Sequence, residues 1–290
     1  MPELKSPIIV LGNFRSGTTL LQRVIASHPD IVELYEPVGL WLYADPARPH
    51  DEFTAAEASP SVKDYIRSQF LNFQEENSGK RIVEKTPHNI LRIDFVRTIF
   101  PDAKFIYLVR NPFSFISSVE LKWQKPAGGK RIWMRLTTTP ITQIHHYVGK
   151  FFSQQFNKRV LGKKYLSIWG PRYNGISHDV AKEDLLTVIA RQWARPVDKA
   201  EKELPNFTET QLLRLRYEDF VAEPLKQLER ICAHCDIDMH EEMIAFVRET
   251  VRTDRQLKWQ RFDTEELARL LPEIRHQMSF YDYEIPEDFR

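Results

Sequence analysis

The sequence predicts an α/β protein, a three-layer domain with a central parallel sheet flanked by helices. Three observations support this fold class. The strand-like segments are short and mainly apolar, which is typical of strands buried on both faces of a sheet. Helical patterns lie next to most of them, as crossover helices do in parallel sheets. The first segment, at 8–11, runs through a polar loop with glycines at both ends directly into a helical pattern.

The elements follow in order along the chain. The predicted strands are 8–11, 81–84, 104–109 and 212–216. The predicted helices are about 17–28, 60–76, 89–99, 113–123, 181–203, 222–234, 239–250 and 264–277. Pro29 and Pro101 close two of the helices, because proline cannot continue a helix. Residues 44–60 contain three prolines and are expected to form a surface loop.

We expect residues 1–290 to form a single domain, with an insertion at about 124–175. Between Glu120 and Asp179 there are eleven lysines and arginines and no acidic residue, and the segment is rich in aromatic residues. It is either a surface subdomain with its own small core or a basic, aromatic wall for an anionic acceptor or an anionic membrane surface.

Composition excludes several classes of function. The net charge of +1 argues against nucleic acid as a partner, and no apolar run approaches the roughly 18 residues of a membrane span. The first ten residues lack the core of a signal peptide, so we expect a cytoplasmic protein, with peripheral membrane contact as the alternative. Cys232 and Cys235 lack a second ligand pair and are expected to be buried structural thiols, so no metal site is predicted.

The loop GNFRSGTT, residues 12–19, has the spacing of a phosphate-binding loop. Gly12 and Gly17 permit turns that point backbone N–H groups inward, and the next helix adds its N-terminal donors. In nucleotide hydrolases a lysine follows the second glycine, but here the residue is Thr18. Transfer of a γ-phosphoryl group is therefore disfavoured, and Arg15 supplies positive charge within the loop.

Three motifs together resemble the sulfotransferases that use 3′-phosphoadenosine 5′-phosphosulfate (PAPS). They are GNFRSGTTLLQ at 12–22, LVRNPFSFISS at 108–118 and LRYEDFVAEP at 215–224. The likeness is greatest to the branch of protein-tyrosine sulfotransferases and their bacterial relatives, from which Phe14 departs by replacing a proline. The resemblance implies a P-loop-type fold, PAPS as the donor, 3′,5′-bisphosphoadenosine as the product, and no metal.

The resemblance also implies how the donor is bound. The 5′-phosphosulfate would contact the loop residues Arg15, Ser16, Gly17, Thr18 and Thr19. Arg110 and Ser118 would bind the 3′-phosphate, and Tyr217 would touch the adenine. Lys258, in RTDRQLKWQ, would close over the phosphates. Alternatively, Tyr217 is a core aromatic residue, and Glu218 and Asp219 cap a helix near Pro224.

Two residues compete as the base that takes the proton of the acceptor hydroxyl. In the tyrosine-sulfating branch it is a glutamate 21 residues after the loop arginine, which is Glu36 here, with Glu33 as the nearer alternative. In cytosolic sulfotransferases it is a histidine in a Lys-Thr-His motif; EKTPHN places His88 one residue out of register. We favour Glu36, and we expect Lys85 to neutralise charge on the sulfuryl group or the leaving phosphate.

The sequence therefore predicts a PAPS-dependent sulfotransferase that acts on a hydroxyl of a glycan, a lipid or another small molecule. The alternatives are a small-molecule kinase of the P-loop type, a sulfotransferase for protein tyrosine with His88 as base, and a non-catalytic anion- or glycan-binding protein. Neither the acceptor nor the oligomeric state follows from the sequence.

Overall fold

The computed structural model describes residues 3–123, 169–252 and 262–285. Within these ranges five parallel strands form one sheet in the order β2-β3-β1-β4-β5. The strands are β1 (Ile8–Leu11), β2 (Ile31–Tyr35), β3 (Arg81–Lys85), β4 (Lys104–Val109) and β5 (Leu212–Arg216). The predicted α/β class with a central parallel sheet is confirmed.

Strand β2 was not predicted from the sequence. It lies at one edge of the sheet, and of its residues only Ile31 is buried, so it lacks the continuous apolar run of β1 and β4. Its register with β3 runs from Ile31 opposite Arg81 to Tyr35 opposite Lys85. This pairing brings the residue after β2, Glu36, to the level at which β3 ends.

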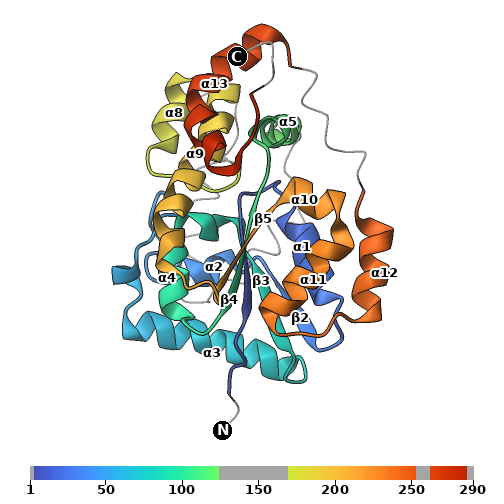
Figure 1. Cartoon of the computed structure of the whole chain (residues 1–290). Coiled ribbons are helices and arrows are strands. Elements are labelled where there is room, and N and C mark those ends of the chain that lie inside the picture. Colours follow the sequence, from blue (N-terminus) through green and yellow to red (C-terminus); the bar gives the residue numbers. More distant parts are fainter. Residues whose placement is uncertain (1–2, 124–168, 253–261, 286–290) are drawn as a thin grey trace.

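Helices flank the sheet on both sides (Figure 1). Those described are α1 (Thr18–Ala26), α2 (Val38–Trp41), α3 (Pro60–Glu76), α4 (Ile93–Ile99), α5 (Pro112–Trp123), α8 (Ile176–Lys182), α9 (Leu185–Glu203), α10 (Tyr217–Ala222), α11 (Pro224–Cys235), α12 (Glu241–Thr250) and α13 (Thr264–Met278). Short 3₁₀ turns are η1 (Ala55–Glu57), η2 (Pro87–Leu91), η4 (Leu204–Asn206) and η6 (Ser279–Tyr281).

Two helices predicted as continuous are interrupted, and a third is preceded by a helix that was not predicted. The expected helix at 89–99 is η2 followed by α4, and the one starting at 222 is preceded by the separate α10. The expected helix at 181–203 divides into α8 and α9, because the Asp184 side chain accepts hydrogen bonds from the N–H groups of Leu186 and Thr187 and so caps a new helix.

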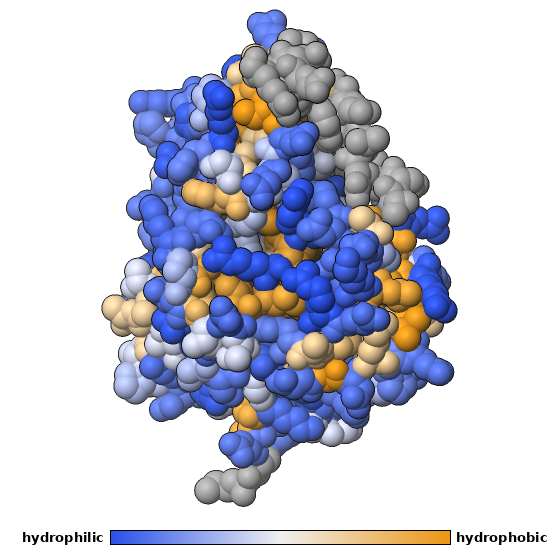
Figure 2. All heavy atoms as spheres, in the orientation of Figure 1, coloured by the Kyte–Doolittle hydropathy of each residue, from blue (hydrophilic) through white to orange (hydrophobic). Residues whose placement is uncertain are grey.

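Two hydrophobic cores lie on opposite faces of the sheet. Ile9 and Leu11 of β1 belong to the core that includes residues of α3, α4 and α9, while Ile8 and Val10 belong to the core that includes residues of α1, α11 and α12. Figure 1 shows these two groups of helices on either side of the strands. The alternation along β1 is the expected result of side chains pointing to opposite faces. Figure 2 shows a mostly hydrophilic outer surface with apolar side chains visible in its central part.

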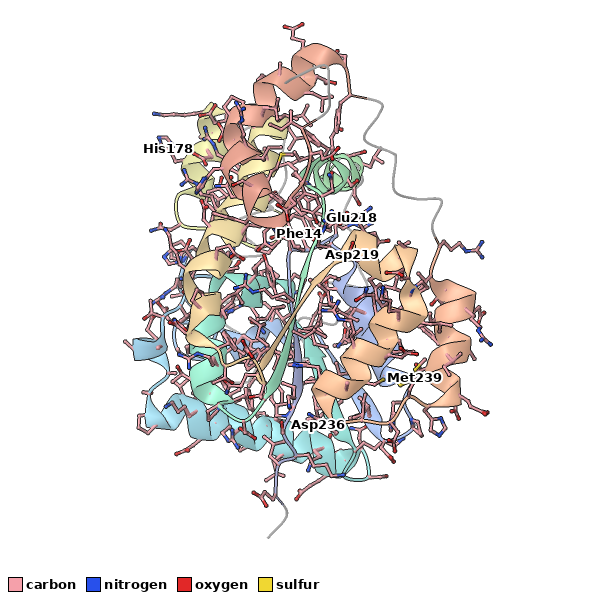
Figure 3. All side chains as sticks on the ribbon, in the orientation of Figure 1. Phe14, His178, Glu218, Asp219, Asp236 and Met239 are labelled. Atoms are coloured by element: carbon pink, nitrogen blue, oxygen red, sulfur yellow. The ribbon has the colours of Figure 1, made fainter. Side chains whose placement is uncertain are left out.

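The strand order reverses at β1. From β1 the chain goes to β2 and β3 on one side, and later to β4 and β5 on the other. The loops after β1 and β4 therefore meet at the carboxyl edge of the sheet, where open α/β sheets bind ligands. Figure 3 shows Phe14, Glu218 and Asp219 at this upper end of the strands and Asp236 at the lower end.

Some predictions lie outside the described residues. They concern Lys258 and most of the basic, aromatic segment, residues 124–168. The expectation that residues 1–290 form a single domain stays a prediction.

Candidate functional site

The loop after β1 is held in its shape by glycines and by one buried amide. Gly12 and Gly17 have φ values of 150° and 91°, which L side chains rarely adopt. A Cβ atom on Gly12 would collide with the carbonyl oxygen of Leu108 on the neighbouring strand. The buried Asn13 donates from Nδ2 to the carbonyl of Trp193 at 3.1 Å, and Ser16 N–H bonds to the Asn13 carbonyl at 3.2 Å.

The structure brings the loop arginine together with the predicted 3′-phosphate residues. An Nη atom of Arg110 donates to the backbone carbonyl of Arg15 at 2.9 Å, and Arg15 Nε donates to Ser118 Oγ at 3.1 Å. Arg110 follows β4, and its own carbonyl accepts from the indole N–H of Trp193 at 2.9 Å. Three predicted residues, which are up to 103 positions apart, thus form one connected group.

Tyr217 is a core aromatic residue, as the alternative expected, and its ring also packs against the loop. A Cβ atom on Gly17 would collide with the Tyr217 ring, and the Arg110 guanidinium lies 4.5 Å from the centre of the same ring. Glu218 does not cap the helix near Pro224: its Oε1 accepts from the N–H of Asn111 at 3.0 Å, and α10 already begins at Tyr217. The third motif is therefore joined to the first two by packing and by a hydrogen bond.

This edge of the sheet has the donors that an anion requires. Ser16 Oγ and Arg110 Nε are buried and make no hydrogen bond within the part of the chain that the structure describes. Thr18 and Thr19 open α1, whose N-terminus has no side-chain cap, so its first N–H groups are available for an anion. Arg15 and Arg110 add positive charge. These residues fit the phosphate groups of a nucleotide donor.

Phe14, which departs from the family pattern, has a packing role. Its ring lies edge-on to Phe115 at 5.1 Å and to Trp169 at 4.8 Å between centroids. Gly170 packs directly against the Phe14 ring, because a Cβ atom at position 170 would come within 2.6 Å of that ring. The loop is therefore packed against the residues that immediately follow the undescribed segment.

Glu36 and Lys85 form an ion pair at the ends of β2 and β3. Lys85 Nζ donates to Glu36 Oε1; the lysine side chain is 1% exposed and that of the glutamate 31%. Glu36 has a φ of 41°, an unfavourable conformation for a residue with a side chain. Such local strain is common at functional sites. Glu33, the alternative base, lies within β2, three residues before Glu36.

His88 lies in η2, three residues after Lys85, and is buried. Its Nε2 is 3.9 Å from Oδ2 of the buried Asp51, and Arg172 binds Asp51 through Nε at 3.2 Å and Nη2 at 2.6 Å. Burial alone would raise the pKa of Asp51, but the electrostatic effects of the neighbouring His88, Arg172 and Arg92 hold that pKa well below its usual range. No local pattern marks Asp51 and Arg172, because they lie 121 residues apart.

Cys232 and Cys235 are free, buried thiols, as predicted. Burial raises their pKa values to about 11 and about 12, so both are protonated at neutral pH. They pack in the core beside α1 and do not contribute to the site.

A three-layer α/β domain with an anion-binding loop after its first strand defines the P-loop-type class of nucleotide-binding proteins. Within this class, the chain belongs to the sulfotransferase family, whose profile matches residues 7–157 and 157–241.

The curated relatives support this assignment. The nodulation protein NoeE of Sinorhizobium fredii is 31% identical over 144 residues, which cover 42% of this chain and 33% of that protein. The protein-tyrosine sulfotransferase of Drosophila melanogaster is 27% identical over 124 residues, 39% of this chain and 25% of that protein. The similarity thus spans a third or less of the length of these relatives.

Solved structures show the same fold. The sulfotransferase domain from the curacin biosynthetic pathway matches 98% of this chain and 100% of its own length, with 17% identity and a TM-score of 0.58. Sulfotransferase STF9 from Mycobacterium avium matches 98% of this chain and 78% of its own length, with 14% identity and a TM-score of 0.54. Among the described residues, no helix combines the length and apolar character needed to cross a membrane.

Proposed function

We propose that this protein transfers the sulfuryl group of PAPS to a hydroxyl group of an acceptor. The observation that carries the proposal is that two groups of residues lie at the carboxyl ends of neighbouring parallel strands of one sheet. One group is Arg15, Arg110 and Ser118. The other is the Glu36–Lys85 pair, at the end of the strand next to β1.

The donor would be held by residues that already lie together. The loop residues Ser16 to Thr19 and the start of α1 face the 5′-phosphosulfate, and Arg110 and Ser118 bind the 3′-phosphate. Tyr217, between Gly17 and Arg110, would support the adenine. Lys258 keeps its proposed role over the phosphates. When bound, PAPS supplies the activated sulfuryl group, and it requires no metal.

Glu36 is the proposed base. Its side chain is partly exposed, so an acceptor hydroxyl can reach it, and its carboxylate can take the proton as that oxygen attacks sulfur. Lys85 orients the carboxylate before the reaction. Because the ammonium group is almost fully buried, its charge is poorly screened and can stabilise negative charge that develops on the leaving phosphate. His88, with Asp51 nearby, is the alternative base.

The acceptor is proposed to be a hydroxyl-bearing glycan, lipid or other small molecule. The basic, aromatic segment at about 124–175 supports this choice, since aromatic rings stack on sugars and basic residues attract anionic groups. We propose that the enzyme acts in the cytoplasm or at the membrane surface. Comparison of the metabolites of the source cell with and without the gene, by mass spectrometry, would reveal the acceptor through the loss of one sulfuryl group.

Ligand binding tests the function directly. Thermal unfolding of the purified chain is measured with 3′,5′-bisphosphoadenosine and, separately, with ATP and magnesium. We expect the bisphosphate to raise the melting temperature and labelled sulfate to move from PAPS to a hydroxyl acceptor. Stabilisation by ATP with magnesium alone would favour the kinase and overturn the proposal.

A further inference from the structure

We propose that Glu84 is a positioning residue for the reaction. It holds both the segment that carries Glu36 and the turn that carries His88 against the end of β3, and thereby sets the geometry of the Glu36–Lys85 pair. The inference depends on the proposed function only in the roles of Glu36 and Lys85.

The carboxylate of Glu84 is fully buried and accepts three hydrogen bonds from neighbouring segments. Its Oε1 accepts from Trp41 Nε1 at 3.1 Å and from Thr86 Oγ1 at 2.5 Å. Its Oε2 accepts from Asn89 Nδ2 at 3.2 Å. Trp41 ends α2, which begins two residues after Glu36, and Asn89 follows His88 in η2.

Arg92 closes these contacts into a ring. The buried guanidinium donates through Nε to Asn89 Oδ1 at 3.0 Å and through an Nη atom to the carbonyl of Trp41 at 3.2 Å. Glu84 and Arg92 thus each form hydrogen bonds with the same two residues, Trp41 and Asn89. Moving α2 or η2 would break hydrogen bonds in the buried interior, where an unsatisfied polar group is costly.

Two successive residues of β3 bind the segment 36–41. Lys85 binds Glu36 at its beginning, and Glu84 binds Trp41 at its end. Successive side chains of a strand point to opposite faces of the sheet. Lys85 and Glu84 therefore hold the two ends of the segment from opposite faces of β3. Glu36 itself has the unfavourable φ of 41°, which persists only where the surrounding structure maintains it. The orientation of the Glu36 side chain therefore depends on the contacts that fix residues 37–41.

Burial raises the pKa of Glu84 to about 7, against the opposing effect of hydrogen bonds from Thr86 and Trp41 and of the charges of Lys85 and Arg92. The parallel neighbours on either side, Ile9 of β1 and Leu34 of β2, are apolar. Burying the Glu84 carboxylate costs free energy of folding, so the residue contributes little to stability. This agrees with a role in orienting the surrounding groups.

The test is an exchange of hydrogen-bonding groups at constant shape, made at pH 8, above the Glu84 pKa of about 7, so that the wild type carries an ionised carboxylate. In Glu84→Gln, the new side-chain NH₂ group is a hydrogen-bond donor. In one orientation it faces the donor Trp41 N–H, and in the other it faces the donor Asn89 NH₂, so one hydrogen bond is lost in either case. If the Asn89 amide rotates so that its oxygen accepts from the new NH₂ group, its own NH₂ group then faces the donor Arg92 Nε. Adding Asn89→Asp restores an acceptor both for the new amide at position 84 and for Arg92, so the double variant Glu84→Gln/Asn89→Asp should rescue the network. Trp41→Phe removes one donor and provides a milder second variant.

We expect Glu84→Gln to lower kcat by about 10- to 100-fold, the scale of a small misplacement of catalytic groups, with the KM for the donor and the affinity for 3′,5′-bisphosphoadenosine within about twofold of wild type. The double variant should recover most of the loss. Acetylation of Lys85 by acetic anhydride, followed by mass spectrometry without any donor, should be several-fold faster in Glu84→Gln than in wild type and should return to the wild-type rate in the double variant.

The control is Glu203→Gln, which alters a largely buried carboxylate bonded to Asp94 N–H at 2.9 Å and to Lys199 at 2.6 Å, away from the site. It should change neither kcat nor Lys85 labelling. Unchanged labelling in both Glu84→Gln and Trp41→Phe, or no recovery in the double variant, would overturn the positioning role. If wild type transfers no sulfuryl group, the proposed function fails, while the labelling still decides the role of Glu84.

Discussion

Lys85 and Glu36 are bonded across the ends of two neighbouring parallel strands, with the lysine almost completely buried and the glutamate partly open to solvent. The register of β2 on β3, with Tyr35 opposite Lys85, creates this relationship. A partly exposed carboxylate oriented by a buried cation can meet an acceptor from outside the protein while the positive charge stays within it.

Glu36→Gln is expected to lower turnover by about 100-fold or more, because a general base is lost while the size of the side chain is kept. Binding of 3′,5′-bisphosphoadenosine, measured by calorimetry, should be unchanged. Glu33→Gln, within β2 three residues before Glu36, is the matched control and should remain close to wild type. Near-normal turnover of Glu36→Gln together with an inactive His88→Asn would show that His88 is the base.

Arg110→Ala is expected to weaken binding of 3′,5′-bisphosphoadenosine by about 10- to 100-fold, since a hydrogen bond to a charged group contributes about 1.5–3 kcal/mol. Turnover at saturating donor should change much less. Arg214→Ala, on the adjacent β5, removes an arginine that is paired with Glu201 at the surface and serves as the control. Equal losses of affinity in the two variants would contradict a specific phosphate contact at Arg110.

Gly17→Ala and Gly79→Ala separate backbone strain from steric conflict. Both glycines have positive φ, 91° and 69°, and each alanine should cost about 1–2 kcal/mol of unfolding free energy for conformation alone. Only at Gly17 would the new Cβ atom collide with the Tyr217 ring, whereas nothing lies within 4 Å at Gly79. Urea unfolding should therefore show the larger loss for Gly17→Ala, and only that variant should lose nucleotide binding. Equal effects would contradict the packing of Tyr217 on the loop.

The raised pKa of Glu84 predicts a particular pH dependence of stability. The carboxyl group keeps its proton up to about pH 7 in the folded protein but ionises near its ordinary value of 4.5 in the unfolded chain. Between these values the unfolded chain binds fewer protons, so the free energy of unfolding falls as pH rises and levels off above about pH 7. The fall attributable to Glu84 is about 3 kcal/mol.

Urea unfolding of wild type and Glu84→Gln between pH 5 and pH 8 measures this contribution as the difference between the two proteins. The wild type should lose stability relative to Glu84→Gln as pH rises through the window. A difference that stays constant with pH would show that the Glu84 carboxyl ionises normally in the fold. Glu203→Gln serves again as the control for loss of a carboxylate elsewhere.

Much of the architecture could be predicted from local patterns. Strands β1, β3 and β4 contain runs of buried apolar residues, and a strand buried on both faces can be recognised from its own sequence. β5 is an edge strand that is only partly buried, and its three leucines predicted it. The loop from Gly12 to Gly17 is also a local feature, because the turn and the helix start that follow depend on consecutive residues. The motifs around Arg110 and Tyr217 can be recognised by their resemblance to the family, whereas their contacts depend on the fold.

Tertiary structure alone decided which of these residues meet. β2 is an edge strand whose mixed sequence has no clear pattern, so the pairing that places Glu36 beside Lys85 depends on the hydrogen-bonding partner β3. Asp51 and Arg172 are joined across 121 residues, and Glu84 acquires its role from Trp41 and Asn89. The sequence by itself thus determined the fold class and the anion-binding loop, which arise from short-range periodicity and turn chemistry. The arrangement of charged side chains around the candidate site was decided by long-range packing, because burial and pairing exist only once distant segments come together.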